Sequence, residues 1–478
     1  MKRIVAAALL CLCALLPLSA QERFDHWFTG GTLRVDLYHT GTKGEERFTL
    51  DRALLEGEWP GHRINLVDTL NLGEYLVSVS DRATNVLLYS RGFSSLFNEW
   101  QTTDEALAGL HRTFSESVRF PFPLRAVRLA LSRRDRRMEF HEVFSAVIDP
   151  SDPVGIVRER PHPLFPVAAV VDNGPPSVKV DIAIMGDGYA ASDMPKYRAD
   201  VSRLVETMFR TRPFRERKKD FNVWRIDVVS EESGIDVPDR GVWKRNALGT
   251  AYNTFGSARY VLTEENRTVR DIASAAPYDF LCILVNDSRY GGGGIFNLYS
   301  TTYTGESVAG QKWQEEYMFV HEFGHSFAGL ADEYYTSSTG YNDFYIPGIE
   351  PWEPNVTARA DGERVKWKAM LTPGIPVPTP WEKGAYDSVE AIRGKLDRLA
   401  PDYYARREPL QQSAMAILRT SRYAGNVGVF EGAGYASHGL YRPSVDCRMF
   451  SLSLADFDPV CSAAIGRMIR FYADPGEK

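Results

Sequence analysis

The sequence predicts a multidomain α+β protein, with an N-terminal antiparallel β-sandwich module followed by an α/β domain. Between residues 24 and about 148, short apolar runs alternate with polar residues and turn residues, as in the strands of a sandwich. A proline-rich stretch follows, and beyond it apolar strands alternate with amphipathic helices. At 478 residues, the chain is also too long for one compact core and predicts two or three domains.

Residues 1–20 are typical of a signal peptide. Lys2 and Arg3 precede the apolar run IVAAALLCLCALLPL, and small residues precede the expected cleavage after Ala20. The run is short for a membrane span and Pro17 interrupts it, although an uncleaved anchor is the alternative. We therefore expect export to a periplasm, the cell surface or the exterior, with no transmembrane span after the signal is removed.

The predicted β-sandwich module occupies residues 21–148. One stretch departs from its strand pattern, because Thr102 or Thr103 is a suitable cap for a short helix that ends near Arg112. Residues 149–177 carry seven prolines and no periodic pattern, so we interpret them as a linker.

The remaining residues, 178–478, form the predicted catalytic domain. Its expected strands and helices alternate, and the strands are apolar enough to be covered on both faces. The strands are expected at 178–189, 221–230, 278–287 and 291–303, and the helices at 194–211, 265–276 and 313–335. Beyond Thr336 the chain is rich in prolines and glycines and is expected to be largely loop.

Charge and cysteine content exclude several classes of function. The net charge is -6 with both signs mixed along the chain, so no basic stripe predicts nucleic-acid binding. Outside the signal peptide the cysteines are Cys282, Cys447 and Cys461. Cys282 lies in an apolar run and is expected to be an inert buried thiol, whereas Cys447 and Cys461 could pair in an oxidising compartment. At these spacings the three predict neither a disulfide framework nor a structural zinc site.

The stretch HEFGHSFAGLADEYY, residues 321–335, carries the strongest chemical signal. His321 and His325 are four residues apart, so on a helix both imidazoles face one point. Glu322 lies beside that point, where it suits a general base acting on a metal-activated water, as in the H-E-x-x-H motif. Two surface histidines beside a solvated glutamate are the alternative, but the surrounding phenylalanines indicate a buried helix, where such a face would need a metal.

A catalytic zinc ion takes three protein ligands, so one more ligand is needed. Gly329 ends the helical run and can adopt the positive φ of a sharp turn, after which Asp332 could return to the same ion. We prefer Asp332 as the third ligand. Glu333 and His438 remain the alternatives.

These residues resemble the helix motif of the IgA-peptidase-like (IgA metalloendopeptidase) zinc metallopeptidases, a bacterial family related to the metzincins. Similar segments extend over most of the chain: FTGGTLRVDLYHTG, YSRGFSSLFNEWQTTDEA, IAIMGDGY, GVFEGAGY and YRPSVDCRM. The resemblance implies a metzincin-like fold with one catalytic Zn²⁺ and a methionine turn below it, for which we prefer Met449 over Met415. It also implies an edge strand, GGGGIFNLYS, along which an extended substrate could pair.

The resulting hypothesis is an exported zinc endopeptidase that acts on proteins or peptides, glycoproteins included. His321, His325 and Asp332 would hold the metal, and Glu322 would be the base. Peptide hydrolysis also needs a stabiliser for the oxyanion, for which we choose Tyr441, with Tyr435 as the other candidate. The alternatives are a surface- or glycan-binding protein with a structural metal, and a zinc amidase that acts on cell-wall or glycopeptide substrates.

Overall fold

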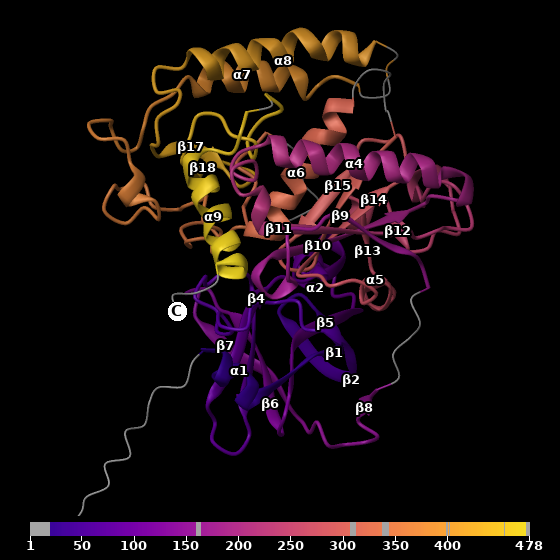
Figure 1. Cartoon of the computed structure of the whole chain (residues 1–478). Helices are drawn as coiled ribbons and strands as arrows, with labels where there is room; N and C mark the ends of the chain where they lie inside the picture. The colour runs from indigo at the N-terminus through magenta and orange to yellow at the C-terminus, as the bar shows by residue number, and fades with distance from the viewer. Residues whose placement is uncertain are drawn as a thin grey trace, which may run out of the picture.

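The computed structural model describes residues 20–158, 164–305, 312–336, 344–397, 400, 402–453 and 455–474. Within these residues it is a mixed α/β structure with several sheets and nine α-helices (Figure 1). Residues 1–19, and with them nearly all of the predicted signal peptide, lie outside the described residues. Among the helices described, none combines the length and the apolar character needed to cross a bilayer.

Two four-stranded sheets make up the N-terminal part. Their strand orders are β5-β1-β2-β8 and β4-β3-β6-β7, and apart from the parallel pair β2–β8 all neighbours are antiparallel. Alternate residues of both sheets, such as Val35 in β1 and Val77 in β3, meet in one buried apolar cluster. The strands are β1 (Phe28–Thr42), β2 (Glu45–Glu58), β3 (Tyr75–Asp81), β4 (Leu87–Phe93), β5 (Arg112–Pro123), β6 (Val127–Arg134), β7 (Phe140–Ile148) and β8 (Ile156–Val157), preceded by helix α1 (Ala20–Trp27).

The helical stretch in this part is shorter than predicted. Helix α2 (Leu96–Trp100) begins at the cap Ser95, and α3 (Asp104–Leu107) begins at Thr103, whose side chain accepts a hydrogen bond from the backbone of Ala106. The Thr103 cap is therefore confirmed, but the helix ends at Leu107 because β5 already starts at Arg112.

A six-stranded sheet forms the centre of the second part. Its order is β15-β16-β14-β10-β11-β9, with the four inner strands parallel and both edge strands antiparallel to their neighbours. Every residue of β10 and β14 is buried, and apart from Asp181 and Asp187 in β10 their sequences are apolar. The strands are β9 (Val167–Val171), β10 (Val180–Asp187), β11 (Phe221–Ile226), β14 (Phe280–Val285), β15 (Gly292–Ile295) and β16 (Tyr299–Tyr303).

One face of this sheet is covered by helices of the same part. Helices α4 (Met194–Arg210), α6 (Lys312–Ala328) and α9 (Pro459–Ala473) share a buried cluster with Ile182 and Ile184 of β10. The other face packs against α5 (Asn266–Ala273) and also against residues of the N-terminal part, among them Phe97 and Trp100. The prediction that the strands are covered on both faces is confirmed, and the N-terminal part supplies some of the cover.

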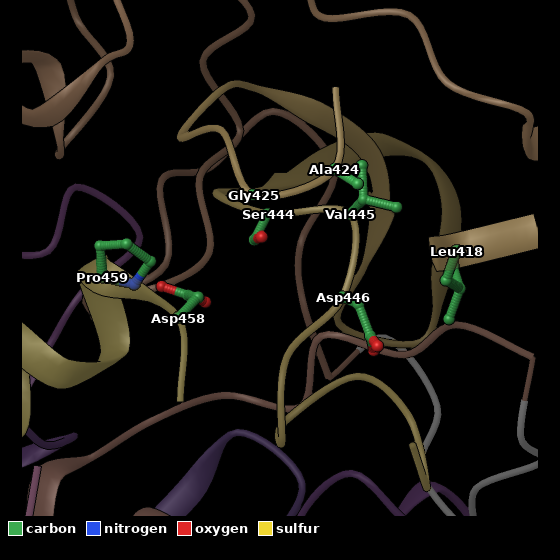
Figure 2. Close-up of a pocket in the computed structure, with 8 residues that line it drawn as sticks. All are labelled: Leu418, Ala424, Gly425, Ser444, Val445, Asp446, Asp458 and Pro459. Atoms are coloured by element: carbon green, nitrogen blue, oxygen red, sulfur yellow. The ribbon is translucent and has the colours of Figure 1, made fainter. Parts of the chain in front are cut away.

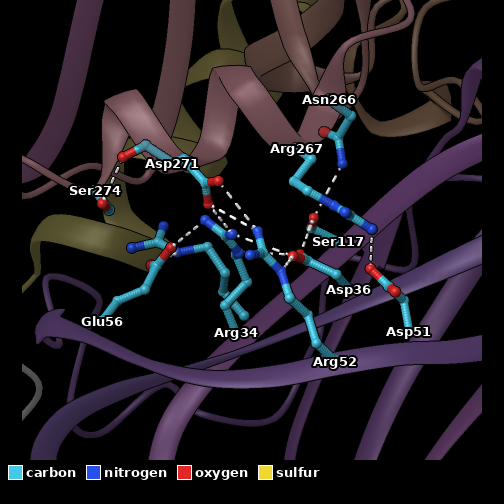
Figure 3. Close-up of polar contacts among 11 residues, drawn as sticks. Arg34, Asp36, Asp51, Arg52, Glu56, Ser117, Asn266, Arg267, Asp271 and Ser274 are labelled. Atoms are coloured by element: carbon cyan, nitrogen blue, oxygen red, sulfur yellow. Dashed lines mark hydrogen bonds and ion pairs between the residues drawn. The ribbon is translucent and has the colours of Figure 1, made fainter. Parts of the chain in front are cut away.

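A polar network joins the two parts beside this apolar contact (Figure 3). The Arg34 guanidinium is fully buried and bonds Glu56 at 2.9 Å, Asp36 in its own strand, and Asp271 in α5. Arg52 also bridges the two parts, at 2.7 Å from Asp36 and 2.9 Å from Asp271. Further pairs across the boundary are Arg267 with Asp51, and Arg112 with Glu264.

Two regions contain more regular structure than predicted. Short strands β8 and β9 lie within residues 149–177, each as the edge strand of a different sheet. Beyond Thr336 the predicted loops are present, but so are α7 (Lys383–Arg393), α8 (Tyr403–Thr420), α9 and the hairpin of β17 (Phe430–Ala433) and β18 (Ala436–Arg442). Helices α7 and α8 lie side by side at the end of the molecule far from the N-terminal part (Figure 1).

Candidate metal centre

Helix α6 carries the histidines and is buried on nearly every side. Phe319, Phe323 and Phe327 pack into the core under the sheet, so the helix cannot rotate to turn its histidines toward solvent. On another side the backbone of β15 approaches closely: a Cβ added to Gly294 would lie 2.3 Å from the carbonyl oxygen of Glu322. Glycine at this position is what allows the strand to lie directly against the helix.

The helix ends as the sequence predicts. Gly329 has φ of +60°, and its amide donates to the carbonyl of His325 at 3.0 Å, which closes the helix with a left-handed residue. Asn355 then holds the returning chain, because its side-chain amide accepts from the Ala331 amide at 2.8 Å and donates to the Ala331 carbonyl at 2.9 Å. The turn brings Asp332 back over the histidines.

Three potential ligand atoms meet at one point. The Nε2 atoms of His321 and His325 are 3.2 Å apart, and Asp332 Oδ1 lies 3.0 Å from the first and 3.3 Å from the second. Atoms that bind one tetrahedral ion at about 2.0–2.1 Å lie about 3.3 Å from each other, so this triangle has the size of one face of a zinc site. Asp332 Oδ1 is also buried, and among the described residues no amide or hydroxyl group donates a hydrogen bond to it. The donor set therefore fits a divalent cation.

The other ring nitrogens fix the orientation of both histidines. His321 Nδ1 lies 3.0 Å from the carbonyl of Arg448, and His325 Nδ1 lies 2.5 Å from the carbonyl of Leu330. Since a carbonyl only accepts, each Nδ1 carries the proton, and the lone pair of a neutral ring is on Nε2. Both lone pairs therefore point toward Asp332.

The charges of these groups influence one another. Burial raises the pKa of Asp332, but the charges of His325 and His321 outweigh it, so the pKa of this carboxyl lies well below its usual range. Burial lowers the pKa of His325, yet the Asp332 carboxylate raises it to about 9. For Glu322, burial dominates and raises the pKa, opposed by the two histidines.

Of the two tyrosine candidates, the structure brings Tyr435 to the cluster. Its hydroxyl donates to Asp332 Oδ2 at 2.5 Å. The amide of Gly434 donates to the Asp332 carbonyl and the amide of Tyr435 to the Tyr334 carbonyl, each at 3.0 Å, so the tip of the β17–β18 hairpin holds the loop. Tyr435 itself has φ of +64°, an uncommon value for a residue with a side chain.

The other sequence candidates lie elsewhere. Tyr441 pairs its backbone with Thr357, and its side chain packs beside Val365 and Trp367. His438 is 77% exposed and lies 3.3 Å from Glu431. Within the described residues neither has a contact with the two motif histidines.

Glu333 and the methionines lie below or away from the three ligand atoms. Glu333 Oε1 accepts a hydrogen bond from Asn355, and the amide of Glu333 donates to the carbonyl of Met449 at 2.9 Å. Met449 is fully buried beneath α6, 3.3 Å from where a Cβ on Gly324 would lie. Met415 lies on α8 instead.

Sequence reasoning missed one cation near the cluster, Arg259. Burial lowers its pKa, but the neighbouring Tyr334, Tyr290 and Asp332 outweigh the effect and raise it. The carbonyl of Arg259 accepts from the amide of Gly292, which places this segment along the outer edge of β15. No motif marks Arg259, because its proximity arises only from this pairing.

That pairing also limits the edge strand. Gly292 donates to Arg259 at 3.2 Å and accepts from Val261 at 3.3 Å, so its outward backbone groups are already used. The next outward-facing residue of β15 is Gly294, directly beside Glu322.

Comparisons with known proteins identify two family models that match the chain. The family model described as IgA Peptidase M64 matches residues 168–469, and the one described as Peptidase M64 N-terminus matches residues 23–145. No curated protein matches the chain.

Proposed function

Because the chain belongs to the IgA Peptidase M64 family and is therefore a peptidase, we propose that it is a zinc endopeptidase with a metzincin-like catalytic part. His321, His325 and Asp332 would hold one zinc ion. The observation that carries this proposal is the triangle of 3.0–3.3 Å between their ligand atoms, at a buried Asp332 Oδ1 to which no amide or hydroxyl group of the described residues donates. When bound, zinc supplies a Lewis acid that polarises the scissile carbonyl and lowers the pKa of water toward about 7.

Glu322 is the proposed general base. It follows His321 on the same helix, and within the described residues no side chain or backbone amide donates a hydrogen bond to its carboxylate. It can therefore take a proton from the attacking water and deliver it to the leaving amine.

Tyr435 is proposed as a positioning residue in place of Tyr441. Its hydroxyl holds Asp332 Oδ2, which leaves Oδ1 turned toward the two histidines. A hydrogen bond of this kind fixes the orientation of a ligand and tunes its basicity.

The substrate is proposed to lie along β15. The only outward edge position between the pairing at Gly292 and the end of the strand is Gly294, so an extended peptide could form backbone hydrogen bonds there, beside Glu322. The positive charge of Arg259 on the same side would favour the developing oxyanion. Met449 beneath α6 would serve as the methionine turn.

Export is proposed from the sequence of residues 1–20, with its charged start and apolar run. Mass spectrometry of the protein released by the producing cell would then find Gln21 at its N-terminus, and an intact Met1 would contradict cleavage.

The decisive experiment compares wild type with Glu322→Gln on a mixture of unfolded proteins, with zinc content measured on the same samples. The expected result is a loss of activity of about 10²–10⁴-fold with the zinc content unchanged. Glu316→Gln is the matched control, because Glu316 lies on the same helix and pairs with Arg203 at 3.5 Å.

Chelation should abolish the activity of wild type, and added zinc should restore it. Full activity in Glu322→Gln, or in chelated enzyme, would sink the proposed mechanism. If the protein were instead a binding protein with a structural metal, wild type and Glu322→Gln would both be inactive on every peptide.

A further inference from the structure

A second group of potential ligands lies behind the loop that carries Asp332. Glu333, Cys447, Asp458 and Cys461 are all buried, and one ligand atom from each lies within 4.8 Å of the others. They come from three segments: the loop after α6, the turn before Met449, and the start of α9. We refer to these four residues as the thiol–carboxylate cluster.

The two thiols are at the separation that a shared metal ion would give. Cys447 and Cys461 are free cysteines with their Sγ atoms 3.8 Å apart. A disulfide would need about 2.05 Å. Two sulfurs bound at about 2.3 Å to one tetrahedral zinc ion lie about 3.8 Å apart.

The two carboxyl groups each leave one oxygen without a partner. Asp458 Oδ1 caps α9 by accepting from the amides of Val460 at 2.6 Å and Cys461 at 3.0 Å, but Asp458 Oδ2 is buried and no donor group of the described residues bonds to it. Glu333 Oε1 accepts from Asn355 at 2.9 Å and from the Cys461 thiol at 3.2 Å, while Glu333 Oε2 is likewise buried and has no hydrogen-bond donor among the described residues. A buried unpaired carboxylate is costly, and two of them side by side need a proton or a cation between them.

A buried cation that interacts with Glu333 does not fill this role. Arg442 is fully buried, but its guanidinium donates to the carbonyls of Gly432 at 2.6 Å and Val445 at 3.2 Å and packs over Phe450. The positive charge of Arg442 favours anions nearby, but its guanidinium donates no hydrogen bond to Asp458 Oδ2 or Glu333 Oε2.

We propose that the thiol–carboxylate cluster is a second, structural metal site that binds zinc or a similar thiophilic divalent cation. Two sulfurs and two carboxylate oxygens would close the coordination shell, as structural zinc sites require, and thiolates select such cations over magnesium or calcium. On binding, each thiol releases its proton to solvent. A cavity of about 190 Å³, lined by Asp458, Pro459 and Ser444, reaches the edge of the cluster and offers an entry path (Figure 2).

This site would stabilise the catalytic loop from below. Glu333 follows Asp332 directly, and Cys447 lies one residue before Arg448, whose carbonyl orients His321. An ion that joins them to α9 would therefore fix the two segments that position the catalytic ligands.

The test is metal analysis of the full-length protein purified in the presence of zinc, and separately of cobalt. Wild type is expected to hold two ions per chain, and Cys447→Ser only one. Because the catalytic ligands include no sulfur, a thiolate-to-cobalt charge-transfer band would report only the second site. This band should persist in His325→Ala and disappear in Cys447→Ser, which separates a failure here from a failure of the proposed catalytic site.

Cys282→Ser is the matched control, since Cys282 is equally buried but lies in β14 beside Ser300; it should keep both ions. If wild type holds one ion per chain and shows no charge-transfer band, the proposal is overturned. This holds whether a thiol reagent finds Cys447 and Cys461 free or the measured mass shows the loss of two hydrogens in a disulfide. Since wild type alone decides this, the proposal stays testable even where Cys447→Ser does not fold.

Discussion

At the scale of single residues, Asp332 depends on groups distant in the sequence. Its backbone carbonyl accepts from Gly434 and its Oδ2 from the Tyr435 hydroxyl, more than a hundred positions along the chain. A carboxylate held in this way keeps one defined oxygen for a metal.

Removal of the Tyr435 hydroxyl should therefore weaken metal binding. In Tyr435→Phe the ring can stay in place while the hydrogen bond to Asp332 Oδ2 is lost, and we expect zinc affinity to fall about 10–100-fold. The measurement is zinc retention during titration with a chelator. Tyr441→Phe makes the same change in the other sequence candidate, and a larger effect there would restore Tyr441 as the functional tyrosine.

The local part of this site could be predicted and the rest could not. His321, Glu322 and His325 are set by the period of one helix, and the return of Asp332 follows from the left-handed turn at Gly329. The choice between Tyr435 and Tyr441 depends on which end of the β17–β18 hairpin reaches the loop that carries Asp332. This is decided by a tertiary contact, which the local sequence does not encode. Arg259 carries no sequence signal at all.

At the scale of elements, the contact between β15 and α6 brings the proposed substrate edge to the proposed base. It requires Gly294, where a Cβ would lie 2.3 Å from the Glu322 carbonyl oxygen and 2.9 Å from His325 Cβ. Neither neighbour can move without displacing the helix backbone or a proposed ligand.

Gly294→Ala should therefore both destabilise the protein and reduce its activity. Overpacking of this kind costs about 1–3 kcal/mol, which thermal unfolding would detect as a lower midpoint. Gly57→Ala is the matched control in strand β2, because a Cβ at Gly57 meets nothing within 4 Å. Equal effects of the two substitutions would show that the close approach is unimportant.

The strands and helices were predicted correctly where the apolar pattern of the sequence was strong. The buried strands β10 and β14 and helix α4 lie within their predicted ranges, whereas α6 begins at Lys312, one residue before its predicted start, and ends at Ala328 instead of residue 335. The short edge strands β8 and β9 were missed because prolines surround them, and their pairing comes from neighbouring strands rather than from local propensity. Helices α7 and α8 were missed because proline-rich loops flank them, and α8 even contains Pro409 near its start.

At the scale of the whole molecule, the network around Arg34 links the stability of the contact between the two parts to pH. Burial raises the pKa of Asp36, but the charge of Arg34 and the hydrogen bond from Ser117 outweigh it, so the pKa lies below its usual value. A carboxyl group with a lowered pKa stabilises the folded state above its unfolded pKa of about 3.9, and this contribution is lost as the pH falls through the folded pKa.

Asp36→Asn should accordingly be less stable than wild type at pH 7, by about 1–3 kcal/mol, and the difference should shrink as the pH falls below about 4. Denaturant unfolding at several pH values would measure it. Asp361→Asn serves as the control, because Asp361 pairs with Arg364 at the surface and its loss should matter little. A difference independent of pH would contradict the assigned role of Asp36.

The cover that the N-terminal part gives to the central sheet has a consequence for cooperativity. The two family matches divide the chain between residues 145 and 168, yet Phe97 and Trp100 belong to the same apolar cluster as Met185 and Ile283. Family matches identify segments that are related in evolution, whereas cooperative unfolding depends on the apolar surface that two segments bury together. We therefore expect the two matched segments to unfold as one unit, because residues of the N-terminal segment form part of the hydrophobic interior of the other segment.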